Sequence, residues 1–159
     1  MEQVEKVNTE RKIAMATRVE EAAGGSVRDK TIAVLGVTFK PNTDDMREAP
    51  SLVIVPMLQA RGAIIRACDP QGRRKGEELL PGMEWFANAV EAAEGADVLV
   101  VLTEWNEFRA ADLKQLRQVM RGDALVDLRN VYAPALAEAA GFVYRGVGRA
   151  PKARTEDMR

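Results

Sequence analysis

The sequence contains no histidine and one cysteine, Cys68, among its 159 residues. Without histidine, neither a Ser/His nor a Cys/His catalytic pair can form, and a typical zinc site loses its commonest nitrogen ligand. A single cysteine excludes an internal disulfide and fits a reducing compartment. Cys68 lies in an apolar, strand-like run, which favours a buried structural thiol over a reactive one. Much hydrolytic chemistry is therefore excluded, and we expect no metal site.

Long apolar runs and an excess of either charge are also missing. No stretch approaches the roughly 20 apolar residues that a membrane-spanning helix needs, and the charged start, MEQVEKVNTERK, does not resemble a signal peptide. The 23 Lys and Arg residues balance 24 Asp and Glu residues, which leaves a net charge of −1. A broad surface for nucleic acid or for anionic membranes is not indicated. We expect a cytoplasmic protein that binds neither.

What is present resembles one ordinary globular domain, with 47% hydrophobic and 30% charged residues. From residue 2 to about residue 23, apolar residues recur every three or four positions among charges, which predicts a long amphipathic helix that ends at Gly24 and Gly25. Its apolar stripe could face another chain or could fold back over its own core. The pattern favours neither alternative.

Short apolar runs then alternate with helix-like segments. The strands are expected at 31–37, 63–69, 97–103, 124–128 and 142–147, with a possible short strand at 83–86. The helices between them are expected at 51–61, 88–94, 112–120 and 134–140. This order predicts an α/β fold, a Rossmann-like parallel sheet flanked by helices and preceded by the long N-terminal helix. We divide the chain into the helix (1–25), the sheet domain (26–147) and a flexible tail without apolar periodicity (148–159).

Charged residues follow the predicted strands, at the edge where open parallel sheets bind ligands. Lys40 and Arg47 lie in the long polar loop after the first strand, and Arg129 follows the strand at 124–128. Lysine and arginine at this edge can bind phosphate or carboxylate groups. The adjacent carboxylates Asp44 and Asp45 could orient these cations, accept hydrogen bonds from ligand hydroxyls or cap the following helix.

The other segments at this edge differ in what they indicate about binding. The dinucleotide fingerprint G-x-G-x-x-G is missing, because Gly36 is followed by Val, Thr and Phe. Close backbone approach to a pyrophosphate is therefore not expected. The pair Asp69 and Pro70 after the second strand is best read as a plain turn. The group at 103–106, Thr-Glu-Trp-Asn, also follows a strand and is expected at the same edge.

In this order and spacing, four segments give the chain a resemblance to a known family: GVTFKPNTDDMREAPS (36–51), CDP (68–70), GADVLVVLTEWNEF (95–108) and VDLRNVY (126–132). From about residue 4 to about residue 147, the chain resembles the C-terminal, sugar-nucleotide-binding domain of UDP-glucose 6-dehydrogenases. The resemblance implies that UDP-glucose or UDP-glucuronate is a ligand. The complete enzymes of this family convert UDP-glucose, two NAD and water to UDP-glucuronate and two NADH.

The resemblance also implies roles for individual residues. Phe39, Lys40 and Arg129 match positions that contact the substrate, the lysine near the sugar carbon that is oxidised or its carboxylate. Arg47 matches an arginine associated with NAD. The helix at 1–25 resembles the end of the long central helix that builds the dimer, so a homodimer through this helix is implied.

Two parts of the family pattern are absent from this sequence: the NAD-binding N-terminal domain and the segment with the nucleophilic cysteine. Cys68 cannot replace that cysteine, because it precedes the Asp-Pro pair of a different strand. We therefore expect no catalytic residue here, and an inactive chain whose partner is the N-terminal NAD-binding domain. Alternatives are the same domain of a UDP-N-acetylmannosamine or GDP-mannose dehydrogenase, and a non-catalytic Rossmann-type oligomerisation or regulatory module.

Overall fold

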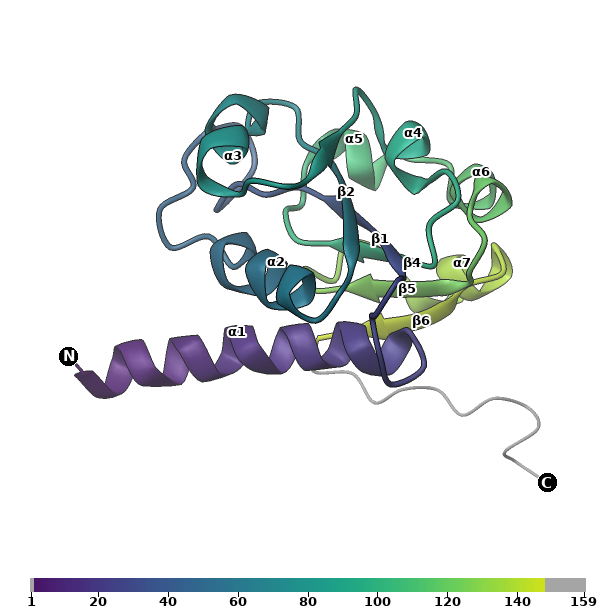
Figure 1. Ribbon diagram of the computed structural model, residues 1–159. Helices are drawn as coiled ribbons and strands as arrows, with labels where there is room; N and C mark the ends of the chain where they lie inside the picture. Colours follow the sequence, from purple (N-terminus) through teal and green to yellow (C-terminus); the bar gives the residue numbers. More distant parts are fainter. Residues whose placement is uncertain (1, 148–159) are drawn as a thin grey trace.

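In the computed structural model, which describes residues 2–147, six strands form one parallel sheet in the order β3-β2-β1-β4-β5-β6 (Figure 1). The strands are β1 (Thr31–Leu35), β2 (Ile64–Cys68), β3 (Glu84–Trp85), β4 (Val98–Val101), β5 (Ala124–Asp127) and β6 (Val143–Gly146). Every neighbouring pair is parallel. The predicted fold class is confirmed, and so is the short strand expected at 83–86.

The strand order reverses between β1 and β4. From β1 the chain proceeds outward to β2 and β3, and then returns to the other side of β1 for β4, β5 and β6. The helices that follow β1 and β4 in sequence therefore leave in opposite directions, which opens a crevice at the carboxyl ends of these two strands. The loops that follow β1, β4 and β5 meet at this crevice.

Seven helices surround the sheet within the described range. They are α1 (Glu2–Ala22), α2 (Ser51–Ala60), α3 (Arg73–Leu79), α4 (Ala89–Ala93), α5 (Asn106–Arg109), α6 (Leu113–Val119) and α7 (Pro134–Ala139). The sequence did not predict α3 or α5. The charged helix α3 contains Gly76, a poor helix former that leaves room for the ring of Trp85, and α5 is one turn long. Both depend on tertiary packing that periodicity does not show.

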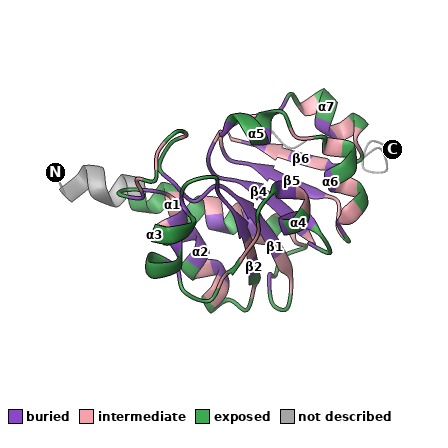
Figure 2. Cartoon of the chain, turned by 90° about the horizontal axis from the view of Figure 1, so that it is seen from above, coloured by how far each residue is buried: buried purple, intermediate pink, exposed green. Residues whose placement is uncertain are grey.

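Apolar side chains leave both faces of the sheet and form two cores. Ile32 and Val34 belong to the core under α1 and α2, whereas Ala33 and Leu35, which alternate with them, belong to the core under α4 to α7. Strands β4 and β5 are buried along their whole length, and β1 is buried from Ile32 onward (Figure 2). This double burial explains why the strands are almost continuously apolar.

Helix α1 runs beside α2 along one face of the sheet (Figure 1). Ala16 and Val19 are fully buried there, and Glu20 pairs with Arg61 at the end of α2. Ile13, on another side of the helix, is 40% exposed. Of the two alternatives for this helix, folding back over its own core is therefore observed. The predicted flexible tail, 148–159, lies outside the described residues, and no helix in the described part is long and apolar enough to cross a membrane.

Candidate functional site

The loop from β1 to α2 (residues 36–50) begins with a turn that other strand ends hold in place. Gly36 has φ +90°, and a Cβ there would lie 2.5 Å from the side chain of Thr103, at the end of β4. The backbone of Gly36 is therefore covered by a side chain and is not open to a pyrophosphate. This packing supports the prediction, made from the missing glycine fingerprint, that the turn is not a dinucleotide-binding loop.

Asp69, after β2, fixes the start of the same loop. Its Oδ2 accepts hydrogen bonds from the amides of Val37 (2.8 Å) and Thr38 (3.2 Å). Its Oδ1 accepts from the amides of Gln71 (3.0 Å) and Gly72 (2.7 Å), as in the turn that the Asp-Pro pair predicts. One buried carboxylate thus joins the loop after β2 to the loop after β1.

Arg129, after β5, joins three strand ends. Its Nε donates to the carbonyl oxygen of Leu102 at 2.9 Å, and its Nη2 donates to the carbonyl oxygen of Phe39 at 2.9 Å. The carboxylate of Glu104 lies 3.7 Å from its Nε. The structure therefore places Arg129 beside the Phe39–Lys40 segment, at the edge that the sequence predicted for both.

Hydrogen bonds to Asp127, the last residue of β5, fix the loop that carries Arg129. The buried carboxylate of Asp127 accepts hydrogen bonds from the amides of Val131 (3.0 Å) and Tyr132 (2.9 Å) and from the hydroxyl of Tyr144 (2.8 Å). Asn130 has φ +51°, a left-handed conformation that asparagine tolerates better than most residues. The backbone at Arg129 is thus held in one conformation, which orients its side chain.

A pocket of about 540 Å³ lies beside these strand ends. It is lined by Arg11, Lys12 and Met15 of α1, by Phe39, Glu48 and Pro50 of the first loop, and by Leu102, Leu128 and Arg129 after β4 and β5. Five of its nine lining residues are apolar, and its charged groups are two arginines, a lysine and the carboxylate of Glu48. Phe39 is 41% exposed, which leaves part of its side chain open for contact with a ligand.

Lys40 and Arg47 lie outside the lining of this pocket. Lys40 is exposed and directly follows Phe39. Arg47 is 89% exposed, and its Nε and Nη2 donate to both carboxylate oxygens of Asp45, each at 3.1 Å. These hydrogen bonds lower the pKa of Asp45 to about 2. Arg47 is therefore held by its own loop, and it faces solvent.

The two aspartates of the first loop orient cations. Asp45 holds Arg47, and Asp44 lies 3.4 Å from the Nζ of Lys75 on α3. Neither caps α2, because the residue before that helix is Pro50 and no side chain accepts a hydrogen bond there. Of the alternatives for this pair, orienting one of the predicted cations is observed for Asp45, whereas Asp44 pairs with Lys75 instead, and neither residue caps α2.

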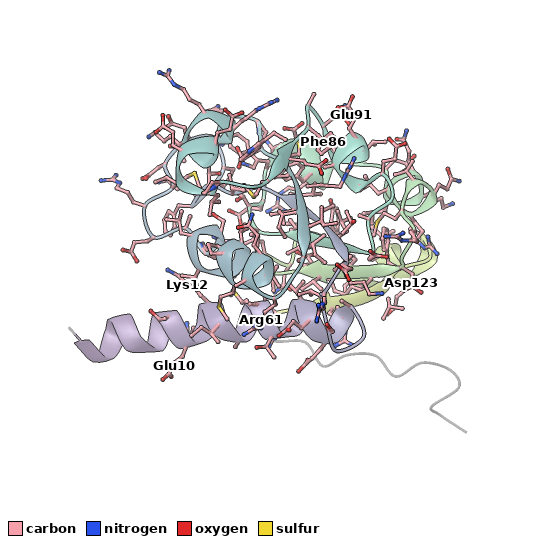
Figure 3. The ribbon with its side chains drawn as sticks, viewed as in Figure 1. Glu10, Lys12, Arg61, Phe86, Glu91 and Asp123 are labelled. Carbon is pink, nitrogen blue, oxygen red and sulfur yellow. The ribbon has the colours of Figure 1, made fainter. Side chains whose placement is uncertain are left out.

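Sequence reasoning missed the contribution of α1 to the pocket. Arg11 and Met15 stand four residues apart on the helix, and Lys12 beside them lies 3.8 Å from Glu48 of the first loop. Figure 3 shows Lys12 on the side of α1 that faces the rest of the domain, whereas Glu10 points away. Helical spacing predicts which residues share a face. It does not say that this face lies against the loop after β1.

The described residues contain no group of three or more His, Cys, Asp or Glu side chains that could hold a metal ion. Cys68 is buried at the end of β2, as predicted. Burial, together with the charge of nearby carboxylates, raises the pKa of its thiol to about 12. A thiol in this state is a poor nucleophile.

Comparisons with known proteins show what the chain is similar to. The profile of the UDP-glucose/GDP-mannose dehydrogenase family, UDP binding domain, matches residues 33–134. The UDP-glucose 6-dehydrogenase of Rhizobium meliloti is 48% identical over 143 residues, which cover 90% of this chain and 33% of that protein. The enzyme of the same name from Pseudomonas aeruginosa is 40% identical over 152 residues, or 92% of this chain and 34% of that protein. The chain thus spans about a third of the length of these relatives.

Solved structures share the overall fold of this chain. A UDP-glucose dehydrogenase from Pyrobaculum islandicum superposes with a TM-score of 0.73 at 28% identity, covering 89% of this chain and 30% of that one. A UDP-D-ManNAc dehydrogenase from Pyrococcus horikoshii gives a TM-score of 0.69 at 26% identity, with 89% of this chain and 31% of that one covered.

Proposed function

Because the chain belongs to the UDP-glucose/GDP-mannose dehydrogenase family, as its UDP-binding domain, we propose that it is the sugar-nucleotide-binding part of an NAD-dependent UDP-glucose 6-dehydrogenase. The complete enzyme would convert UDP-glucose, two NAD and water to UDP-glucuronate and two NADH. The relatives with 48% and 40% identity carry that name, which favours UDP-glucose over other sugar nucleotides. The UDP-D-ManNAc dehydrogenase from Pyrococcus horikoshii is 26% identical to this chain.

The observation that carries this proposal is the pocket beside Phe39 and Arg129. Its apolar wall offers contact to a planar base, and its cations offer charge to a diphosphate. Arg129 is oriented in advance by two backbone carbonyls, so its charge costs little entropy to position when a ligand binds. A nucleoside diphosphate needs this combination of a flat apolar surface and fixed positive charge.

Each of the sequence-derived site residues has a role in the proposal. Phe39 and Arg129 contact the sugar nucleotide in the pocket, and Lys40 extends from the adjacent position towards the sugar, near the carbon that is oxidised or its carboxylate. Arg47 meets NAD from the outer side of the loop, where it is exposed. Arg11 and Lys12 of α1 add positive charge at the pocket.

The cofactor itself would be held mainly by another part of the enzyme. In the described part of this chain, the turn at Gly36 is covered by Thr103, and Arg47 is the single residue that we assign to NAD. When bound, NAD would supply the hydride acceptor for each of the two oxidations that lead from the sugar alcohol to the carboxylate. The residues of this chain bind and orient the nucleotide, while an N-terminal NAD-binding domain would provide the cofactor site and the nucleophilic cysteine.

The assembly is also part of the proposal. The N-terminal NAD-binding domain is one partner, and a second copy of the chain is the other. The exposed side of α1, which includes Ile13, is the surface that we assign to the homodimer.

Isothermal titration with UDP-glucose, UDP-glucuronate, GDP-mannose and NAD on one sample tests the function. We expect the two UDP-sugars to bind and NAD to give no measurable heat. A preference for GDP-mannose would move the assignment to the GDP-mannose branch of the family. Absence of binding to all four would support the non-catalytic oligomerisation or regulatory module instead.

A further inference from the structure

Thr38, the residue before Phe39, is hydrogen-bonded on all its polar atoms, by residues that follow β2 and β4 and by Lys40 of its own loop. It is 1% exposed. Its amide donates to Asp69 Oδ2 at 3.2 Å, and its carbonyl oxygen accepts from the hydroxyl of Thr103 at 2.7 Å. Its own hydroxyl lies 3.1 Å from the carbonyl oxygen of Lys40 and 3.2 Å from Asp69 Oδ2. The backbone on both sides of Phe39 is therefore tied to Thr38.

The indole of Trp105 supplies the remaining partner of this hydroxyl. Its Nε1 donates to Thr38 Oγ1 at 3.3 Å, and the side chain is 5% exposed. A threonine hydroxyl has one proton and two lone pairs. When the indole donates to one lone pair, the proton is free to point at an acceptor, either Lys40 or Asp69. Asp69 Oδ2 already receives two amides, so the Lys40 carbonyl is the acceptor that lacks this competition.

Trp105 has no place in the pocket itself, since it is absent from the residues that line it. Its polar atom is directed to a residue one position before Phe39, and Trp105 directly precedes α5, which gives it a fixed backbone. A buried tryptophan normally finds a hydrogen-bond partner for its N–H. Here that partner is the hydroxyl that orders the Phe39–Lys40 segment.

We propose that Trp105 is a positioning residue, which acts through the hydroxyl of Thr38 to hold the Phe39–Lys40 segment in the conformation that receives the sugar nucleotide. The proposal rests on the function assigned above to that segment. The hydroxyl of Thr38 links the indole to the Lys40 carbonyl, while Thr103 and Asp69 hold the rest of the residue. Loss of the indole N–H would leave the loop folded but less confined.

Amide hydrogen exchange tests the positioning without any ligand. In Trp105→Phe and in Thr38→Val, the amides of residues 37–39 should exchange at least about fivefold faster, since a net hydrogen bond has been removed. Thr38→Ser keeps the hydroxyl and should exchange like the wild type. Trp85→Phe is the matched control, because it makes the same replacement at an indole that packs on Gly76 and not on Thr38. Unchanged exchange at 37–39 in Trp105→Phe would overturn the proposal, even if Thr38→Val failed to fold.

Titration with UDP then connects the positioning to binding. We expect Trp105→Phe and Thr38→Val to bind UDP about fivefold to tenfold more weakly, and Thr38→Ser and Trp85→Phe to bind it like the wild type. If Trp105→Phe and Thr38→Val exchange faster at 37–39 but bind UDP as tightly as the wild type, Trp105 orders the loop without affecting ligand binding. That result would overturn the proposal. No UDP binding by the wild type would instead refute the proposed function, and hydrogen exchange alone would then decide whether Trp105 orders the loop.

Discussion

Arg129 holds two backbone carbonyl groups in place and also lines the pocket. These carbonyls belong to Leu102 and Phe39, and two nitrogen atoms of the guanidinium donate to them. Charged residues at strand ends are often dispensable for folding, and the sequence pattern does not indicate a structural role for Arg129. The structure does, because removal of the guanidinium leaves two carbonyl oxygens without their donors.

Arg129→Ala and Lys40→Ala should therefore differ. Arg129→Ala should lower the free energy of unfolding by about 2 kcal/mol, since hydrogen bonds from a charged donor are lost, and should also weaken UDP binding. Lys40→Ala should weaken binding with little change in stability, because Lys40 is exposed. Urea unfolding and calorimetric titration of both variants, with Lys114→Ala as an exposed control, measure this. Equal stability of the two variants would contradict the dual role of Arg129.

Cys68 makes stability depend on pH in the alkaline range. Folding raises the pKa of its thiol from 9.0 to about 12, so the fold favours the protonated form. Its contribution is complete below pH 9 and is lost as pH rises towards about 12, because the unfolded chain ionises first.

The stability difference between the wild type and Cys68→Ala isolates this effect. Above pH 9 the difference should shrink by up to about 1.4 kcal/mol per pH unit, and other ionisable groups cancel between the two proteins. Urea unfolding at several pH values from 7 to 10.5 provides the data. A difference that stays constant over this range would show that the thiol is not held protonated by the fold.

Sequence reasoning assigned Phe39 and Arg129 to one edge of the sheet, where the structure has them, but it did not predict their hydrogen-bond partners. Residues after parallel strands share one edge of the sheet, so Phe39, Lys40 and Arg129 could be brought together in advance. That Arg129 donates to the carbonyl of Phe39 depends on the path of the first loop. The path of that loop depends on contacts between residues far apart in the sequence, such as the hydrogen bonds that the amides of Val37 and Thr38 donate to Asp69.

At the scale of elements, the strands were predictable and some helices were not. The two strands in the middle of the sheet, β1 and β4, are apolar runs rich in β-branched residues and packed on both faces, a pattern that few other structures produce. Helix α5 is a single turn whose one buried side chain, Phe108, gives no periodicity to detect. Helix α1 was predicted at nearly its observed bounds, but the side that it buries could not be known before the sheet was placed.

The packing of α1 gives a prediction for that element. Val19→Ala should reduce the free energy of unfolding by about 2 kcal/mol, because Val19 is fully buried against the sheet. Ile13→Ala should change it by less than about 0.5 kcal/mol in the monomer, since Ile13 is 40% exposed. Urea unfolding at low protein concentration compares them. Equal losses would mean that α1 does not cover the core as described.

Ile13→Ala should also weaken self-association if the exposed side of α1 forms the homodimer. Sedimentation at increasing concentration measures this, with Val19→Ala as the matched change on the buried side.

At the scale of the whole molecule, one reversal of strand order locates the site. The crevice between the ends of β1 and β4 collects loops from three strands, and α1 completes the pocket from the outside. In the function proposed above, this arrangement binds and orients the sugar nucleotide. Since the chain covers about a third of its curated relatives, the chemistry itself is assigned to the remaining parts of the enzyme.

The chain should therefore not reduce NAD in the presence of UDP-glucose, even at high protein concentration. Its one cysteine is buried and protonated near neutral pH, so the thiol cannot attack an aldehyde. Absorbance of NADH at saturating UDP-glucose and NAD is the measurement. Clear turnover would mean that this chain holds a nucleophile and a cofactor site that we assign elsewhere.

The most direct test of the central claim is a map of amide chemical shifts as UDP is added to the chain. We expect the largest changes at Phe39, Lys40 and Arg129 and at Met15 of α1, because these residues surround or adjoin the pocket. Changes confined to the opposite end of the sheet, or no changes at saturating UDP, would contradict the claim that the nucleotide binds between α1 and the ends of β1, β4 and β5.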